Sequence, residues 1–141
     1  MPESSPLRVA IVDDDPSYGR AVARLLRASR MEPRTFASAE EYLARGSEGP
    51  VDCILLDIQL GGMSGFDLHG QLASAGSTTA VVFISGQSEG AATRAAEAGC
   101  RFVRKSDPGE VLLDAIRRAV AGEVLPHEAV AVDPDVLHLS G

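Results

Sequence analysis

The chain has 141 residues, the length of one domain that can bury a substantial core. Its formal net charge is −7, and this acidic balance does not favour contact with a phosphate backbone, so we expect no direct nucleic-acid binding by this chain. No apolar run approaches the roughly 20 residues that span a bilayer, and the N-terminus has no signal-peptide pattern, so we expect no membrane association. Cys53 and Cys100 form no CxxC pair, which favours two reduced thiols in a cytoplasmic protein.

Five strand-like segments alternate with five helix-like segments along the chain. The predicted strands are residues 7–12, 31–36, 51–56, 80–84 and 101–104. The predicted helices are residues 16–29, 38–45, 64–74, 89–98 and 108–119. This alternation indicates a parallel sheet with right-handed crossovers.

Capping signals mark the first and last helices. Asp15 is a good N-cap, and Pro16 suits the first helical position. Asp107 and Pro108 repeat that pattern before the last helix. The apolar face of the first helix consists of Tyr18, Val22, Leu25 and Leu26. By contrast, the helix over 89–98 is almost all alanine and offers little apolar bulk to hold it against a sheet.

The composition of the strands predicts their order. The segments 7–12, 51–56 and 80–84 are apolar throughout and belong inside the sheet, whereas 31–36 contains proline and 101–104 is charged, so both belong at its edges. We therefore predict an α/β fold, a flavodoxin-like three-layer (βα)5 sandwich with strand order 2-1-3-4-5. In this order the first and third strands are neighbours, and their carboxyl ends bring three carboxylates together.

These carboxylates belong to Asp13, Asp14 and Asp57. Two like charges 4 Å apart repel by about 4 kcal/mol at a near-surface effective dielectric, so such a cluster favours a bound cation. Oxygen donors at an open, polar site suit Mg²⁺, which also binds phosphates. A carboxylate beside the metal can act as a nucleophile and form an acyl phosphate. Asp57 is the first candidate, because it directly follows the buried run 53–56.

Two further strand ends carry residues that suit a phosphorylated carboxylate. Ser85 ends the fourth strand and offers a hydroxyl donor, and Lys105 follows the fifth and offers a compact cation. Lys105 is the only lysine in the chain, and its flexible point charge differs from the rigid fork of arginine. Taken singly, Ser85 is more typical of a turn, and Lys105 is about equally typical of a protected strand edge. Together with the three carboxylates, they favour a phosphoryl-transfer site.

Four motifs, in order, resemble the receiver domains of two-component response regulators. They are IVDDDP at 11–16, LLDIQLGGMSGFDL at 55–68, VVFISG at 81–86 and AGCRFVRKS at 98–106. The resemblance implies that Asp57 accepts a phosphoryl group from a histidine kinase or a histidine phosphotransfer protein, assisted by Ser85 and Lys105. It also implies that three carboxylates and one backbone carbonyl hold Mg²⁺, namely those of Asp13, Asp14, Asp57 and Gln59.

The same resemblance implies a switch built from Ser85 and Phe102. Phosphate on Asp57 would draw Ser85 inward, and Phe102 would fill the space it leaves. The surface formed by residues 89–118 would then change its affinity for a partner, including a second copy of the chain in a homodimer.

The chain departs from the family pattern at two positions near the site. Position 106 is serine where the family has proline in a cis peptide, and a cis bond before a non-proline residue costs about 2.5–4 kcal/mol, so the sequence leaves open whether this bond is cis or trans. Gly61 stands where the family has proline, which loosens the loop after Asp57.

The expected division is an N-terminal extension over 1–6, a receiver domain over 7–121, and a tail or truncated linker over 122–141. The chain is then either a stand-alone receiver or the N-terminal regulatory module of a longer DNA-binding response regulator. A Mg²⁺-dependent phosphohydrolase with an Asp nucleophile is a weaker alternative, because its second Asp would stand at the position of Gln59. Flavin binding rests on fold analogy alone. We therefore expect a signalling switch, not an enzyme.

Overall fold

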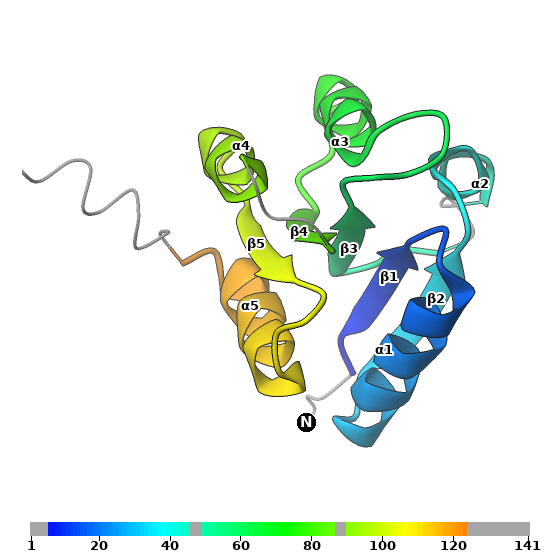
Figure 1. Cartoon of the computed structure of the whole chain (residues 1–141), viewed down its shortest axis with the longest axis vertical. Helices are drawn as coiled ribbons and strands as arrows, with labels where there is room; N and C mark the ends of the chain where they lie inside the picture. The colour runs from blue at the N-terminus through cyan, green and yellow to red at the C-terminus, as the bar shows by residue number, and fades with distance from the viewer. Residues whose placement is uncertain (1–5, 46–48, 87–89, 124–141) are drawn as a thin grey trace, which may run out of the picture.

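The structure is a computed structural model that describes residues 6–45, 49–86 and 90–123. Five parallel strands form one sheet in the order β2-β1-β3-β4-β5 (Figure 1), which confirms the predicted flavodoxin-like topology. The strands are β1 (Arg8–Val12), β2 (Glu32–Phe36), β3 (Cys53–Asp57), β4 (Ala80–Ser85) and β5 (Arg101–Arg104). The helices are α1 (Pro16–Ala28), α2 (Ala39–Arg45), α3 (Gly65–Ser74), α4 (Ala91–Glu97) and α5 (Gly109–Ala121). In the described part of the chain, none of them has the length and apolar composition needed to cross a membrane.

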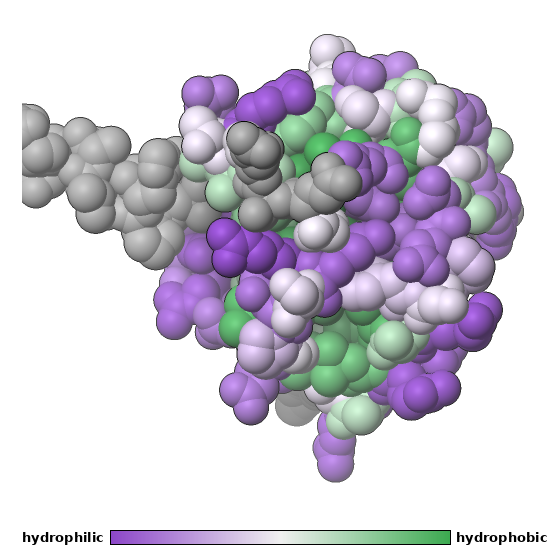
Figure 2. All heavy atoms as spheres, viewed as in Figure 1, coloured by the Kyte–Doolittle hydropathy of each residue, from purple (hydrophilic) through white to green (hydrophobic). Residues whose placement is uncertain are grey.

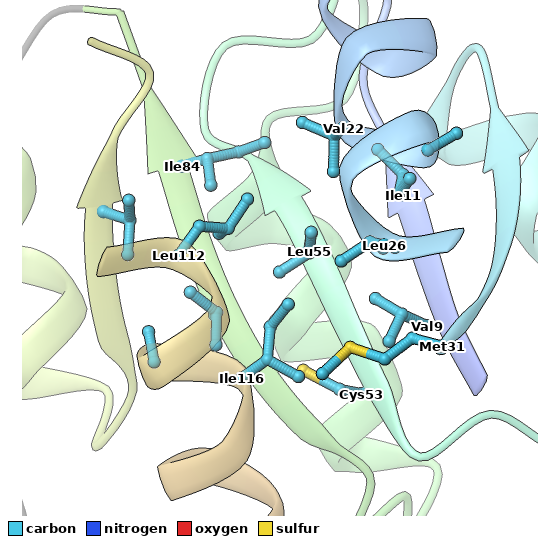
Figure 3. Close-up of a cluster of buried hydrophobic side chains, with 14 residues drawn as sticks. Val9, Ile11, Val22, Leu26, Met31, Cys53, Leu55, Ile84, Leu112 and Ile116 are labelled. Carbon is cyan, nitrogen blue, oxygen red and sulfur yellow. The ribbon is translucent and has the colours of Figure 1, made fainter. Parts of the chain in front are cut away.

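Helices cover both faces of the sheet, and successive strand residues point into two separate apolar clusters. The first cluster lies under α1 and α5 and includes Ile11, Leu26, Leu55 and Ile116 (Figure 3). The second lies under α2, α3 and α4 and includes Leu56. Because Leu55 and Leu56 are neighbours that face opposite clusters, β3 is buried on both sides, as its unbroken apolar run predicted.

The two predicted edge strands do lie at the edges. β2, which contains Pro33, pairs only with β1, and β5, which contains Arg101 and Arg104, pairs only with β4. Proline lacks an N–H for a second neighbour, and charged side chains discourage pairing with another chain. The three apolar strands β1, β3 and β4 therefore form the centre of the sheet.

The start of α5 differs from the prediction in its cap. Asp107 does not cap α5, because its Oδ2 accepts the backbone N–H of Arg104 at 2.9 Å and so closes the turn after β5. Pro108 takes the N-cap position instead, so the predicted Asp107 cap was wrong. The alanine-rich α4 begins after Gly90, whose φ of 74° lies in the left-handed region that glycine tolerates, and residue 89 of the predicted helix lies outside the described residues.

Gly65 allows α3 to begin close against the end of β3. Its N–H donates to Ile58 O at 3.0 Å, and a Cβ on Gly65 would clash with the Asp57 carbonyl. Ser64 caps the helix, with its Oγ accepting the N–H of Asp67 at 3.1 Å. This close approach determines how the chain leaves β3, and therefore where the Asp57 side chain lies.

Candidate functional site

The carboxyl ends of β1, β3, β4 and β5 meet at one edge of the sheet. The register pairs β1 with β3 up to the residues just before Asp13 and Asp57, so these two follow as neighbours. Ser85 ends β4, and its carbonyl accepts the backbone N–H of Lys105 at 2.9 Å, just beyond β5. Viewed as in Figure 1, hydrophilic residues cross the middle of the surface between two hydrophobic areas (Figure 2), in keeping with polar loops between two apolar layers.

Asp13, Asp14 and Asp57 lie together, as the strand order implied. Each offers a carboxylate oxygen, and these oxygens lie within 4.8 Å of one another. Asp13 and Asp57 are buried, with exposed fractions of 5% and 3%, whereas Asp14 is exposed. Asp13 Oδ1 accepts the N–H of Asp15 at 2.9 Å, and Asp57 Oδ1 accepts the N–H of Gln59 at 3.0 Å. Backbone hydrogen bonds therefore orient both buried carboxylates.

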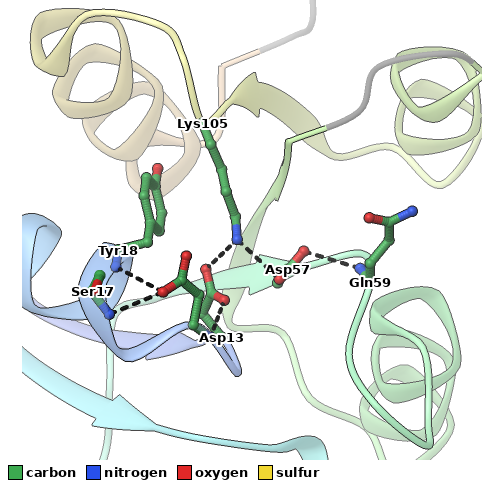
Figure 4. Close-up of polar contacts among 7 residues, drawn as sticks. Asp13, Ser17, Tyr18, Asp57, Gln59 and Lys105 are labelled. Atoms are coloured by element: carbon green, nitrogen blue, oxygen red, sulfur yellow. Dashed lines mark hydrogen bonds and ion pairs between the residues drawn. The ribbon is translucent and has the colours of Figure 1, made fainter.

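Lys105 bridges the two buried carboxylates (Figure 4). Its Nζ lies 2.8 Å from Asp13 Oδ2 and 3.2 Å from Asp57 Oδ2. The peptide between Lys105 and Ser106, whose isomer the sequence left open, is trans. The ammonium group thus reaches the acidic cluster without a proline at position 106.

The two buried carboxylates carry more negative charge than Lys105 alone balances. Burial raises the pKa of Asp57 to about 6, and the charge of Asp13 also raises it, while the Gln59 N–H and Lys105 act in the opposite direction. Lys105 Nζ lies against both Asp13 Oδ2 and Asp57 Oδ2, so a single positive charge is shared by two buried carboxylates.

This set of donors fits a magnesium ion. The carboxylates of Asp13, Asp14 and Asp57 supply the oxygen ligands that Mg²⁺ prefers. Because Asp14 is exposed, one side of the cluster is open to the waters and phosphate oxygens that complete the coordination of this ion. A second cation would also reduce the repulsion between the buried carboxylates, which share the ammonium of Lys105.

The remaining predicted residues border the cluster on β3, β4 and β5. Ser85 is almost fully buried at the end of β4. Gln59 lies beyond β3 with an exposed side chain, and its backbone faces Asp57. Phe102 is half-buried on β5, paired with Phe83 of β4 and three residues before Lys105. Phe102 therefore lies further from the carboxyl edge than the polar residues.

Tyr18 belongs to the site, although the sequence indicated only a core role for it on α1. Its ring lies beside the Lys105 side chain, with Nζ 4.8 Å from the ring centroid (Figure 4). Burial raises the pKa of Tyr18 to about 12, so the ring is uncharged at neutral pH. The one available signal was an aromatic residue in the first turn of the helix that follows the acidic loop.

One protein family matches most of the chain: the response regulator receiver domain, over residues 9–117. The response regulator protein TmoT of Ectopseudomonas mendocina is 34% identical over 114 residues, which cover 79% of this chain and 52% of TmoT. The nitrate/nitrite response regulator protein NarP of Escherichia coli is 34% identical over 143 aligned positions, covering 92% of this chain and 62% of NarP. The chain thus spans about half the length of the first of these relatives and somewhat more of the second.

Solved structures share the fold. A CheY-like response regulator receiver domain protein from Methanospirillum hungatei gives a TM-score of 0.74 at 24% identity, covering 84% of this chain and 96% of that one. The response regulator protein TrrA of Thermotoga maritima, in complex with Mg²⁺ and BeF, gives a TM-score of 0.73 at 23% identity, covering 80% of this chain and 98% of that one. At these identities, the likeness establishes the fold.

Proposed function

The chain belongs to the response regulator receiver domain family, and we propose that it is a phosphorylation switch with Asp57 as the phosphoacceptor. The observation that carries this proposal is the position of Asp57. It is a buried carboxylate at a strand end, 3.2 Å from Lys105 Nζ and in a group of three acidic residues whose oxygens lie within 4.8 Å of one another. A nucleophile, a fixed cation and a set of metal ligands thus lie within reach of one phosphoryl group.

The proposed reaction transfers a phosphoryl group from a phosphohistidine to Asp57. A carboxylate oxygen of Asp57 bonds to phosphorus while the P–N bond breaks, and the departing imidazole keeps the bonding electron pair. The ammonium of Lys105 pairs with one phosphoryl oxygen, and the hydroxyl of Ser85 donates to another. Lys105 is suited to this because the charges of Asp57 and Asp13 raise its pKa against the effect of burial, so it is a cation at neutral pH.

The proposed magnesium ligands are three carboxylates and one backbone carbonyl, those of Asp13, Asp14, Asp57 and Gln59. When bound, the ion supplies the positive charge that lets an anionic phosphoryl group approach a cluster of carboxylates. The clustering of the three carboxylates and the raised pKa of Asp57 support this part of the proposal.

The proposed output is a change in the surface formed by residues 89–118, which the structure describes from residue 90 onward. Ser85 would move toward the phosphoryl group, and Phe102 would fill the space it leaves. α4 is suited to respond, because it has only 7 residues and buries only Ala91 and Ala95. A helix with so little buried surface can shift at low energetic cost.

We propose a histidine kinase or histidine phosphotransfer protein as the phosphodonor, and a cytoplasmic location in which Cys53 and Cys100 remain reduced thiols.

The receiver domain would comprise residues 7–121, with an extension over 1–6 and a tail or linker over 122–141. The output partner would be a DNA-binding segment of a longer regulator or a second copy that docks on the surface over 89–118. The greater length of TmoT and NarP supports the longer regulator. Residues 1–5 and 124–141 lie outside the described residues.

Intact-mass measurement after incubation with acetyl phosphate tests this proposal. We expect one phosphoryl adduct on the wild type in the presence of Mg²⁺, and none after chelation. Asp57→Asn should form no adduct, with its fold checked by circular dichroism. A folded wild type that forms no adduct would contradict the proposal and indicate a receiver that docks without phosphorylation. Steady release of phosphate from phosphomonoesters would instead indicate a phosphohydrolase.

A further inference from the structure

Tyr18 and Lys105 are linked to each other by a direct contact and by a series of hydrogen bonds and an ion pair around the acidic cluster. Asp15 Oδ1 accepts the backbone N–H of Tyr18 at 3.4 Å, and the N–H of Asp15 donates to Asp13 Oδ1 at 2.9 Å. Asp13 Oδ2 lies 2.8 Å from Lys105 Nζ, which in turn lies 4.8 Å from the Tyr18 ring centroid. The loop that orients the Asp13 carboxylate therefore also contacts the backbone of Tyr18, whose ring lies beside Lys105.

The ring restricts a side chain that would otherwise have considerable freedom. A lysine has four rotatable side-chain bonds, and its ammonium is a point charge without the preorganised fork of arginine. The carboxylates of Asp13 and Asp57 hold Lys105 Nζ at one end, and the Tyr18 ring lies alongside the chain that carries it (Figure 4). The negative face of an aromatic ring attracts an ammonium group, so the ring favours the conformers in which Nζ stays near it.

We propose that Tyr18 is a positioning residue, whose ring holds the Lys105 ammonium at the place where it pairs with the phosphoryl group on Asp57. This inference rests on the proposed function. It extends that function by assigning to α1 a part in phosphoryl transfer. The aromatic ring, and not the hydroxyl, carries this role. Phenylalanine at position 18 should therefore preserve the positioning of Lys105, whereas an aliphatic side chain of similar size should not.

Core packing is the competing explanation for Tyr18, since its side chain also packs against the first apolar cluster. Leu25 provides a matched control. It lies on the same helix, is partly buried against the same cluster, and has no contact with Lys105 among those that define the site. Leu25→Ala should lower the free energy of unfolding and leave the rate of phosphorylation unchanged, whereas Tyr18→Leu should lower the rate.

The rate of adduct formation from acetyl phosphate, at saturating Mg²⁺, tests the inference in a double-mutant cycle. We expect Tyr18→Leu to slow phosphorylation roughly threefold to tenfold, and Tyr18→Phe to restore the rate to within about twofold of the wild type. In a Lys105→Met background, Tyr18→Leu should have almost no further effect, because the group it positions is gone. Equal slowing in both backgrounds, or equal slowing by Leu25→Ala, would overturn the inference.

A second measurement separates failure of this inference from failure of the proposed function. Because Lys105 is the only lysine, ¹³C,¹⁵N-lysine labelling reports this one side chain by NMR in the unphosphorylated protein. We expect ring-current shifts of its terminal CH₂ and NH₃⁺ protons in the wild type and in Tyr18→Phe, and their loss in Tyr18→Leu. Absence of these shifts in the wild type would overturn the inference that Tyr18 positions Lys105. Their presence in a wild type that forms no adduct would overturn only the role in phosphorylation.

Discussion

Lys105 Nζ lies 3.2 Å from Asp57 Oδ2, although the two residues are 48 positions apart in the chain. Their contact depends on the parallel pairing of β3 with β4 and of β4 with β5, which brings the ends of the three strands to one edge. Asp13, from the other neighbour of β3, shares the same ammonium at 2.8 Å. The site is therefore a product of strand order, and its stability and reactivity depend on how these few charges are balanced.

The first prediction concerns pH and the charge of Asp57 in the absence of metal. Its pKa is about 6 in the folded protein and 3.8 as an ordinary Asp, so the folded state holds this proton more tightly than the unfolded chain. Ionisation of Asp57 therefore lowers the free energy of unfolding as the pH rises from about 4 to about 6, by on the order of 2–3 kcal/mol.

Asp57→Asn removes this ionisation. We expect the variant to be more stable than the wild type above pH 6, and the gain to disappear below about pH 4, where Asp57 is protonated in the wild type. Urea denaturation at several pH values, in EDTA, measures the difference. A gain that is the same at all these pH values would contradict the predicted effect of charge. Added Mg²⁺ should reduce the gain at neutral pH.

The second prediction concerns Mg²⁺ binding. A ligand that binds only the folded state stabilises it by about 2.7 kcal/mol at a concentration 100 times its Kd, so Mg²⁺ should raise the melting temperature. Asp13→Asn should greatly weaken this effect, because Asp13 is buried in the cluster. Glu97→Gln makes the same change in charge at an exposed position on α4 and serves as the control. Equal loss of the Mg²⁺ effect in both variants would indicate general electrostatic screening instead of a site.

The third prediction concerns the two glycines of α3. Gly65→Ala should destabilise the protein by about 2 kcal/mol or more, because the new Cβ would clash with the backbone carbonyl of Asp57. Gly70→Ala lies in the same helix with no atom within 4 Å of its new Cβ, so it should stabilise the protein by about 0.5–1 kcal/mol. Chemical denaturation of both variants provides the test, and a stable Gly65→Ala protein would mean that α3 can retreat from β3.

The fourth prediction concerns the attachment of α4. The Arg94 guanidinium lies 4.0 Å from the centroid of the Phe66 ring on α3, a cation–π contact at a helix that buries only two alanines. Arg94→Ala should lower the opening free energy of α4 by about 0.5–1 kcal/mol. Faster hydrogen exchange at the amides of α4, with unchanged exchange in β3, would meet this expectation. Unchanged exchange in α4 would show that Arg94 does not hold the helix.

Much of the fold could be predicted because its signals are local. The apolar run of β3 belongs inside a sheet whatever surrounds it, and Pro33 excludes β2 from a central place. The Asp15 cap of α1 was also predictable, since its hydrogen bonds span only two and three residues. The cap expected from Asp107 failed because the equally local backbone N–H of Arg104, three residues before it, donates to the same carboxylate.

The sequence by itself therefore determined the alternation of strands and helices, the order of the strands, and the placement of Asp13, Asp14 and Asp57 at neighbouring strand ends. Only the tertiary structure decided the contact between Tyr18 and Lys105 and the raised pKa of Asp57. The physical reason is that hydrophobic periodicity and capping are properties of adjacent residues. A ring contact or a pKa depends instead on burial and on distances of a few ångströms between segments that only the packed fold brings together.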